Sequence, residues 1–383
     1  MSIDKRVETP CYVIHKNELN KMMIEFVYDV QRVYSRTIVA YSYKTNYYNE
    51  VIKSAKSAGL WAEVVSEDEY CLAKKIGYTN KIIFNGPVKS YESFTDAMEN
   101  GAIVNIDSIR EIEWLGKLPK SKKYRIGLRL NYKLSRYCKE INETDEVCSR
   151  FGFDVESDKF RDIIEKIRSL GNVEICGFQM HRSDNSRSVD IYKSMIYAAK
   201  DIAQKNNICL DFIDLGGGMK LGVYEELTAI SYMVGIKNAL NETGMNGVYV
   251  VLEPGNSLVY RSIDYITQVI DVKLIGENCY VTLDGSRIHT DPLFKKQTYL
   301  EIEILSESKV EYKKMYLCGF TCKETDRFTI LNNQRIQVGD YVAFKKIGSY
   351  TMSLAPSFIE GFPRVYIKDD KTIYIQKRKE MLY

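Results

Sequence analysis

The chain has 383 residues, of which 45% are hydrophobic and 27% are charged, a composition that supports a globular core and argues against a disordered or fibrous protein. With 54 basic and 51 acidic residues the net charge is only +3, so we expect no nucleic-acid partner. The longest apolar runs fall far short of the ~18 residues that a membrane helix needs, so we expect no membrane partner.

The amino-terminal segment, the cysteines and the histidines give three further expectations. The segment 1–6 is polar overall and contains no apolar signal segment, so we expect a cytoplasmic protein. Nine cysteines, an odd number, indicate that most thiols are reduced and buried. The sequence has no Cys-x-x-Cys pair, and its histidines, His15, His181 and His289, come from distant segments. We therefore expect no catalytic metal.

Short apolar runs alternate with stretches long enough for one helix over 27–260. Helices are predicted over Ile52–Ala58 and Ser66–Ile76, the second opening with a capping box at Ser66 and Glu69. Eight strand–helix units favour a (β/α)8 TIM-like barrel, although an open, doubly wound sheet would show the same alternation. The eight expected strands are Thr37–Tyr43, Trp61–Val65, Lys81–Phe84, Ile103–Ile106, Tyr124–Asn131, Glu174–His181, Leu210–Leu215 and Val248–Leu252.

After about residue 260 the pattern changes, and strand-like runs follow one another with turns in place of helices. Asp284-Gly285 and Gly339-Asp340 are suited to such turns. We expect an all-β domain over 261–383, into which the segment 1–26 pairs through the strand-like run Pro10–Ile14. The expected strands are Ile263–Leu274, Asn278–Leu283, Thr298–Ile304, Lys314–Cys318, Tyr341–Lys345 and Arg364–Ile367.

Four barrel strands are followed by chemically useful residues, at the end of the barrel where active sites lie. Lys44 follows the first strand, where its amine is either suited to Schiff-base chemistry or simply extends to solvent. The run Gly216-Gly217-Gly218 offers backbone N–H groups to a phosphate. A buried Glu253 needs a proton or a cation as its partner. His181 either packs in the core or stacks its ring on a flat cofactor. Together, these residues point to pyridoxal phosphate.

Seven motifs stand in one order along the chain from Thr9-Pro10 to Tyr366. They are Tyr41-Ser42-Tyr43-Lys44-Thr45-Asn46, Ser149-Arg150-Phe151-Gly152, His181, Asp214-Leu215-Gly216-Gly217-Gly218, Glu253-Pro254-Gly255, Cys318-Gly319-Phe320-Thr321-Cys322 with Asp326, and Gly348-Ser349-Tyr350-Thr351-Met352 ahead of Phe358 and Gly361-Phe362. With these motifs the chain resembles the barrel-type (fold type III) pyridoxal-phosphate decarboxylases, the alanine racemase-like barrel enzymes that include diaminopimelate and ornithine decarboxylases. The resemblance implies a carboxy-lyase.

The resemblance also implies a role for each matching residue. Lys44 would form the covalent link with the cofactor aldehyde, and Cys322 would return a proton to the substrate carbon after carbon dioxide leaves. His181 would stack on the pyridine ring, and Glu253 would face its nitrogen. Because Cys322 and Tyr350 belong to the partner subunit in this family, it implies a homodimer with shared sites. The cofactor phosphate would contact Gly217, Gly218, Gly255, Asn256 and Tyr350.

Several positions depart from the family's pattern. His181 is followed by Arg182-Ser183-Asp184-Asn185 in place of a Gly-Ser continuation. Asn256 stands where diaminopimelate decarboxylase has an arginine that binds the substrate carboxylate. The Arg-Pro pair of the next substrate loop is absent from Asp284–Lys296. The resemblance therefore leaves the substrate open, while it implies substrate contacts at Arg150 and Asp326.

Basic residues replace acidic ones near the expected substrate. Lys323, beside Cys322, stands where the family has an acidic residue for the substrate's distal amine, and Lys295 and Lys296 fall near another acidic contact. Lysine attracts an anion and repels an ammonium, so we expect a modified or conjugated substrate with an anionic or amide-like distal end. Relatives in siderophore, peptide-antibiotic and carrier-linked biosynthesis use such substrates. The alternative is that these lysines point to solvent.

Three other functions stay open. The first is plain diaminopimelate decarboxylase of lysine biosynthesis. The second is an alanine racemase, which Glu253 disfavours because the cofactor nitrogen of that enzyme faces an arginine. The third is a non-catalytic homologue that acts as a binding partner, as the antizyme inhibitors do, and Lys44 and Cys322 speak against it.

Overall fold

The computed structural model describes residues 7–142, 146, 149–182, 188–221, 227–296, 301–370 and 372–375. The chain divides into two compact units. The barrel unit consists of Met23–Lys44 and Ala55–Ser257, and the β unit contains the chain up to Met22, Thr45–Ser54 and the chain from Leu258 onward. No helix in the described ranges is both long and apolar enough to span a membrane.

The barrel unit is built on eight parallel strands that close into a ring. The strands pair in the order β5-β4-β3-β2-β10-β9-β8-β6, and β5 pairs with β6. This closure confirms the predicted barrel and excludes the open sheet. A short strand, β7, extends the sheet beyond β6. The strands are β2 (Thr37–Ser42), β3 (Trp61–Val64), β4 (Ile82–Phe84), β5 (Ile103–Ile106), β6 (Tyr124–Asn131), β7 (Phe153–Asp154), β8 (Val173–Gln179), β9 (Phe212–Asp214) and β10 (Tyr249–Leu252).

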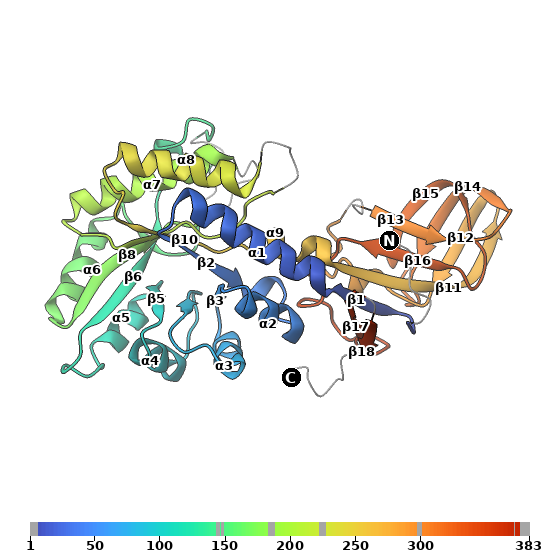
Figure 1. Cartoon of the computed structure of the whole chain (residues 1–383), viewed down its shortest axis with the longest axis horizontal. Coiled ribbons are helices and arrows are strands. Elements are labelled where there is room, and N and C mark those ends of the chain that lie inside the picture. The colour runs from blue at the N-terminus through green and yellow to red at the C-terminus, as the bar shows by residue number, and fades with distance from the viewer. Residues whose placement is uncertain are drawn as a thin grey trace. The chain divides into compact units, whose positions relative to one another are not determined.

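Helices connect these strands, and α3 to α8 lie on the outside of the barrel (Figure 1). The predicted helix start at Ser66 is confirmed, because its hydroxyl accepts the N–H of Glu69 at 3.2 Å. The Glu69 carboxylate accepts from the N–H of Val65 at 2.8 Å. The helices are α1 (Lys16–Val33), α2 (Asn49–Ser57), α3 (Glu67–Ile76), α4 (Tyr91–Glu99), α5 (Ile109–Leu115), α6 (Asp158–Ser169), α7 (Val189–Lys205), α8 (Ala229–Glu242) and α9 (Asn256–Val259).

An aromatic ring packs inside the barrel. Phe212, on β9, packs in a buried cluster with Ala40, Ile83, Cys176 and Val251. A Cβ atom on Gly177 would lie 2.2 Å from Cζ of Phe212, so the ring fills the volume that a side chain there would occupy. A Cβ atom on Gly127 would lie 2.9 Å from the same atom and 1.9 Å from Oδ1 of Asn105, so the ring and this amide together leave no room for a side chain at Gly127.

The β unit contains a second sheet, in the order β15-β14-β12-β11-β1-β17-β18, with β16 joining β11 to β13. The amino-terminal strand β1 pairs antiparallel with β11 and parallel with β17. Sequence analysis missed β15 and β18, whose exposed polar positions interrupt the apolar pattern. The expected strand start at Thr298 lies outside the described residues. The strands are β1 (Cys11–His15), β11 (Ile263–Ile275), β12 (Asn278–Leu283), β13 (Glu301–Leu305), β14 (Glu311–Cys318), β15 (Arg327–Arg335), β16 (Tyr341–Lys345), β17 (Arg364–Asp369) and β18 (Thr372–Ile375).

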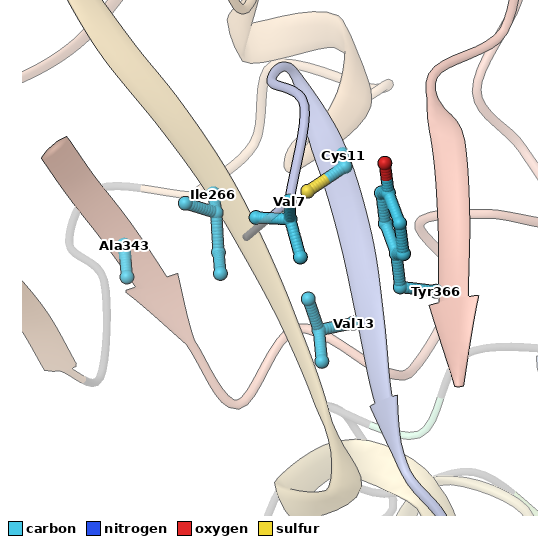
Figure 2. Close-up of a cluster of buried hydrophobic side chains, with 6 residues drawn as sticks. All are labelled: Val7, Cys11, Val13, Ile266, Ala343 and Tyr366. Atoms are coloured by element: carbon cyan, nitrogen blue, oxygen red, sulfur yellow. The ribbon is translucent and has the colours of Figure 1, made fainter. Parts of the chain in front are cut away.

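A buried apolar cluster joins the amino-terminal strand to the rest of this sheet (Figure 2). Cys11 and Val13 come from β1, whereas Ile266 comes from β11 and Tyr366 from β17. Because these strands are far apart in the sequence, burial of their side chains ties the amino-terminal strand β1 to β17, near the other end of the described chain.

We predict that Gly177→Ala destabilises the barrel by about 1–3 kcal/mol, because its methyl group would collide with the Phe212 ring in a packed interior. Urea unfolding followed by tryptophan fluorescence measures this, since both tryptophans, Trp61 and Trp114, belong to the barrel unit. Gly247→Ala is the control, because no atom lies within 4 Å of its added Cβ. Adding Phe212→Leu should recover part of the loss, and unchanged stability of Gly177→Ala would contradict this packing.

Candidate active site

The carboxyl-terminal ends of the barrel strands gather a set of buried polar side chains. Lys44 lies in a 3-10 turn (Tyr43–Thr45) directly after β2. Its Nζ atom donates to Oε2 of Glu63, on β3, at 2.9 Å, and Ser42 donates to the same oxygen at 2.5 Å. The Lys44 side chain is 44% exposed and that of Glu63 only 1% exposed. The amine therefore reaches the open end of the barrel while its carboxylate partner lies below it.

Glu63 is an ionised partner for this amine. Burial raises the pKa of the Glu63 carboxyl, but the Lys44 charge and the hydrogen bonds from Ser42, Lys44 and Asn85 outweigh that effect and leave the pKa lowered. Sequence analysis did not select Glu63. The available signal was one acidic residue inside an otherwise apolar predicted strand, which by itself does not say what faces the carboxylate.

Two asparagines link Glu63 to a second pair of carboxyl groups. Nδ2 of Asn85, just after β4, donates to Oε1 of Glu63 at 3.1 Å and to Oε1 of Glu253 at 2.5 Å. Asn105, on β5, donates to Oδ1 of Asn85 at 2.8 Å and to Oδ2 of Asp214 at 3.0 Å. Every member of this network is at most 5% exposed. The barrel thus contains a continuous chain of hydrogen bonds across its carboxyl-terminal end.

Glu253 and Asp214 are buried neighbours whose pKa values are both raised. Burial raises the pKa of Glu253 well above its ordinary value, and the charges of Asp214 and Glu63 raise it further. Burial also raises the pKa of Asp214, to about 7. Three carboxyl groups therefore share this network with one lysine ammonium. A cation placed against Glu253 would remove the need for the proton.

The glycine turn after β9 is confined on two sides. Gly216 has φ of +70°, and a Cβ atom on it would lie 2.3 Å from Nδ1 of His181. A Cβ atom on Gly217 would lie 2.2 Å from the backbone oxygen of Glu253. Only glycine fits between the His181 ring and this strand end. The N–H of Gly216 donates to Oδ1 of Asp214 at 2.9 Å, so the turn is also tied to the buried network. Gly218 also has a positive φ, of +99°.

Other predicted barrel residues lie near this end or outside the described ranges. Gly255 is buried, and Asn256 is the exposed first residue of α9. The departure at Ser183 to Asn185 falls outside the described residues. The guanidinium of Arg150 stacks 4.1 Å from the centre of the Phe151 ring, which Arg129 also contacts at 4.3 Å.

In the β unit, the loop between β14 and β15 carries Cys322 and Lys323, both exposed. Asp326 anchors this loop and is only 2% exposed. Its carboxylate accepts from Ser286 Oγ at 3.0 Å, from the Arg287 N–H at 2.8 Å and from the Thr321 hydroxyl at 2.7 Å. This geometry favours a loop-holding role for Asp326 over the substrate contact that the resemblance implied. The eight cysteines described form no disulfide, and only four of them are buried.

The lysines expected at the substrate differ in their surroundings. Nζ of Lys323 lies 5.6 Å from the centre of the Phe294 ring and 6.0 Å from that of Phe358. Nζ of Lys296 donates to the Thr290 carbonyl at 2.6 Å, and burial lowers its pKa. The side chain of Lys295 is exposed. Lys323 is therefore flanked by aromatic rings, whereas Lys296 is bound to its own loop.

Tyr350 has a left-handed backbone, with φ of +54°, which a tyrosine rarely adopts. Its N–H donates to the carbonyl of Thr45 at 2.9 Å, and its side chain is 43% exposed. The backbone contact fixes this residue within the β unit and leaves the phenol available.

Comparison with known proteins identifies the family and the fold of this chain. The profile of the family described as "Pyridoxal-dependent decarboxylase, pyridoxal binding domain" matches residues 20–260. The crystal structure of diaminopimelate decarboxylase from Methanocaldococcus jannaschii aligns with a TM-score of 0.83 at 22% identity, covering 97% of this chain and 89% of the other.

Two further relatives are decarboxylases that are named for substrates other than diaminopimelate. The 2-[(L-alanin-3-ylcarbamoyl)methyl]-2-hydroxybutanedioate decarboxylase of Staphylococcus aureus is 25% identical over 89% of this chain and 88% of its own length. The L-glutamyl-[BtrI acyl-carrier protein] decarboxylase of Niallia circulans is 24% identical over 94% of this chain and 89% of its own length. Since the family profile covers more than half of the chain, the protein belongs to the pyridoxal-dependent decarboxylases, and its barrel is their pyridoxal-binding domain.

Proposed function

We propose that this pyridoxal-phosphate-dependent amino-acid decarboxylase acts on a substrate whose distal end is anionic or amide-like. The observation that carries the proposal is Lys323, an exposed lysine beside Cys322 whose ammonium lies near the rings of Phe294 and Phe358. The family makes the protein a carboxy-lyase, and the substrate is the part that we infer.

The residues at the carboxyl-terminal end of the barrel fit the cofactor. When bound, pyridoxal phosphate supplies an electron sink for the carbon that loses carbon dioxide. We assign its covalent attachment to the half-exposed amine of Lys44. Glu253 would face the ring nitrogen, and His181, packed over Gly216, would stack on the ring. Its phosphate would be bound by Gly217, Gly218, Gly255 and Asn256, with the Tyr350 phenol.

The charge balance of the buried network supports the assignment of Glu253. With only Lys44 as a cation beside three carboxyl groups, the pKa values of Glu253 and Asp214 are raised. A protonated ring nitrogen against Glu253 would supply the second positive charge and let this carboxyl ionise. In turn, the ionised carboxylate would hold the proton on the ring nitrogen.

Glu253→Gln should flatten the pH dependence of stability in the cofactor-free protein. Because both folded pKa values are raised, the folded chain holds protons that the unfolded chain releases, so stability is full at low pH and falls as pH rises through these values. Each such proton costs about 1.4 kcal/mol for every pH unit over which only the folded chain holds it. The glutamine amide keeps hydrogen bonds to Asp214 and Asn85 without a proton to lose.

Thermal unfolding at pH 5.5 and pH 8 measures this difference, with the exposed Glu307→Gln as the control. With cofactor added, Glu253→Gln should also weaken cofactor binding, because a neutral amide does not balance a protonated ring nitrogen. An unchanged pH dependence together with unchanged cofactor affinity would contradict the assignment of Glu253.

The surroundings of Lys323 support an anionic or amide-like substrate end. An ammonium there would repel the distal ammonium of diaminopimelate or ornithine and attract a carboxylate or an amide oxygen. Of the other two lysines, Lys296 donates to Thr290, so Lys295 is the better candidate for a second contact. The Staphylococcus aureus relative is named for a substrate with an amide and a butanedioate, which carries two carboxylates. The Niallia circulans relative is named for a glutamyl group on a carrier protein.

Diaminopimelate decarboxylase is the second candidate, because relatives of that name align with this chain at about the same identity, 22% for the enzyme of Methanocaldococcus jannaschii. Release of carbon dioxide over a substrate panel separates the two. The panel contains diaminopimelate, ornithine, glutamate and an amino acid whose side-chain amine is acylated by a hydroxy-polycarboxylate.

Lys323→Ala should raise KM for the preferred substrate more than it lowers kcat. A partly desolvated charge-assisted hydrogen bond is worth about 1.5–3 kcal/mol, or roughly 10- to 100-fold in affinity. Lys323→Glu should be worse because it adds repulsion. The exposed Lys309→Ala is the matched control. Efficient turnover of diaminopimelate or ornithine by the unmodified enzyme, with KM unchanged in Lys323→Ala, would overturn the proposed substrate class.

We also propose a homodimer in which each site takes Cys322 and Tyr350 from the partner subunit. Both side chains are exposed in the single chain, as residues that serve a partner would be. Lys44 lies in the barrel unit, whereas Cys322 and Tyr350 lie in the β unit. Cys322 would return a proton to the substrate carbon from the partner's side.

Mixing inactive Lys44→Ala chains with inactive Cys322→Ala chains should restore activity. Random exchange of shared-site dimers leaves about a quarter of all sites with both residues intact. Activity is measured after subunit exchange has been demonstrated with labelled chains. No recovery despite complete exchange would mean that each chain builds its own site.

A further inference from the structure

The barrel unit contains a cavity of about 530 Å³ at the amino-terminal ends of its strands. Its lining comes from residues at the starts of β2, β5, β6, β9 and β10, whereas the catalytic residues follow the opposite ends. The volume lies in the range of small-molecule sites. We call it the amino-terminal cavity, and the lining residues used below are Arg36, Lys123, Tyr124, Arg125, Asp211 and Tyr249.

The floor of this cavity is apolar. Phe212, Ile38 and Ile103 line it, and all three belong to or pack against the buried cluster in the barrel interior. The Phe212 ring packs against the backbone of Gly177, because a Cβ atom there would lie 2.2 Å from the ring. The floor is therefore a packed apolar surface, suited to a flat or aliphatic ligand body.

The rim of the cavity is positively charged. Arg36, Lys123 and Arg125 contribute three positive charges and Asp211 one negative charge, which leaves the lining at +2. Arg125 is paired with Asp211, and the Arg36 guanidinium lies 5.2 Å from the centre of the Tyr249 ring. Lys123 has no ion-pair partner within the described ranges. An anion would therefore find at least one cation that no carboxylate already neutralises.

A buried hydroxyl supplies an independent sign of a ligand. Tyr124 is 4% exposed and lines the cavity, and its hydroxyl has no hydrogen-bond partner among the described residues. A buried polar atom without a partner costs free energy that a ligand oxygen or nitrogen would recover. The amino-terminal cavity thus combines an apolar floor, a cationic rim and an unsatisfied polar group.

We propose that the amino-terminal cavity binds a small amphipathic anion, with an apolar body on the floor and a carboxylate-like or sulfonate-like group at the rim beside Lys123 and Arg36. The site is separate from the catalytic end of the barrel, and the proposal does not depend on the substrate. The floor belongs to the same strands that position the catalytic residues. Any effect of a bound ligand on those residues would therefore pass through the packing of the barrel.

Titration of the holoenzyme with 8-anilinonaphthalene-1-sulfonate tests the proposal, because this probe has an apolar body and one negative charge. We expect saturable fluorescence enhancement with one probe per chain. Lys123→Glu should weaken probe binding by about tenfold or more, since it removes the unpaired cation and adds an anion. Asp211→Asn should act in the opposite direction and tighten binding, because it makes the lining more positive while keeping the side chain's shape.

Lys309→Glu, in the β unit, has the same change in charge and should leave the probe's affinity unchanged. Thermal unfolding midpoints establish that each variant is folded. The proposal is overturned if binding is not saturable, if Lys123→Glu and Asp211→Asn shift the affinity in the same direction, or if Lys309→Glu weakens binding as much as Lys123→Glu does.

Discussion

An excess of buried negative charge governs the catalytic end of the barrel. Glu63, Asp214 and Glu253 lie in one hydrogen-bonded network that is closed to solvent, and Lys44 is the one cation that contacts it among the described residues. Three ionised carboxylates in such a place would repel one another strongly. The protein can relieve this repulsion by holding a proton or by binding a cation. A protonated pyridine nitrogen of the cofactor would be such a cation.

The amide groups between these carboxyls give the network its geometry. Asn85 and Asn105 carry no charge, so they connect the three acids without neutralising them. Lys89 holds the backbone of Asn105 and that of Gly86, the residue after Asn85, because its ammonium donates to both carbonyls. The same ammonium pairs with Glu111 at 3.1 Å. This ion pair is fully buried, and its remaining hydrogen bonds are made within the barrel. A buried pair of this kind fixes position more than it adds stability.

Glycine decides the use of space at two places in the barrel. In the interior, Gly127 and Gly177 leave room for the Phe212 ring, which lines the amino-terminal cavity. At the carboxyl-terminal end, Gly216 and Gly217 fit between the His181 ring and the strand end that carries Glu253. In both places a single methyl group would collide with its neighbours, so the packing depends on the absence of a side chain.

The sequence by itself determined the barrel and the identity of the cofactor. Apolar runs of the right length and spacing specify buried parallel strands, and short motifs after the strands contain Lys44, His181 and Glu253, the residues that we propose for the cofactor. Strands β15 and β18 escaped the same reading, because edge strands with exposed polar residues lack a buried run. For the same reason, periodicity located the elements more reliably in the barrel than in the second sheet.

Only the tertiary structure decided which polar residues meet. Glu63 lies on β3 and Asn85 just after β4, and closure of the barrel brings them together with Glu253. Likewise, the resemblance implied a substrate contact for Asp326, and only the fold shows that this residue is buried and that its oxygens hold a loop. The sequence pattern indicates which residues of an element are buried and which are exposed. Which charge faces which is set by contacts between distant segments, and those exist only once the chain has folded.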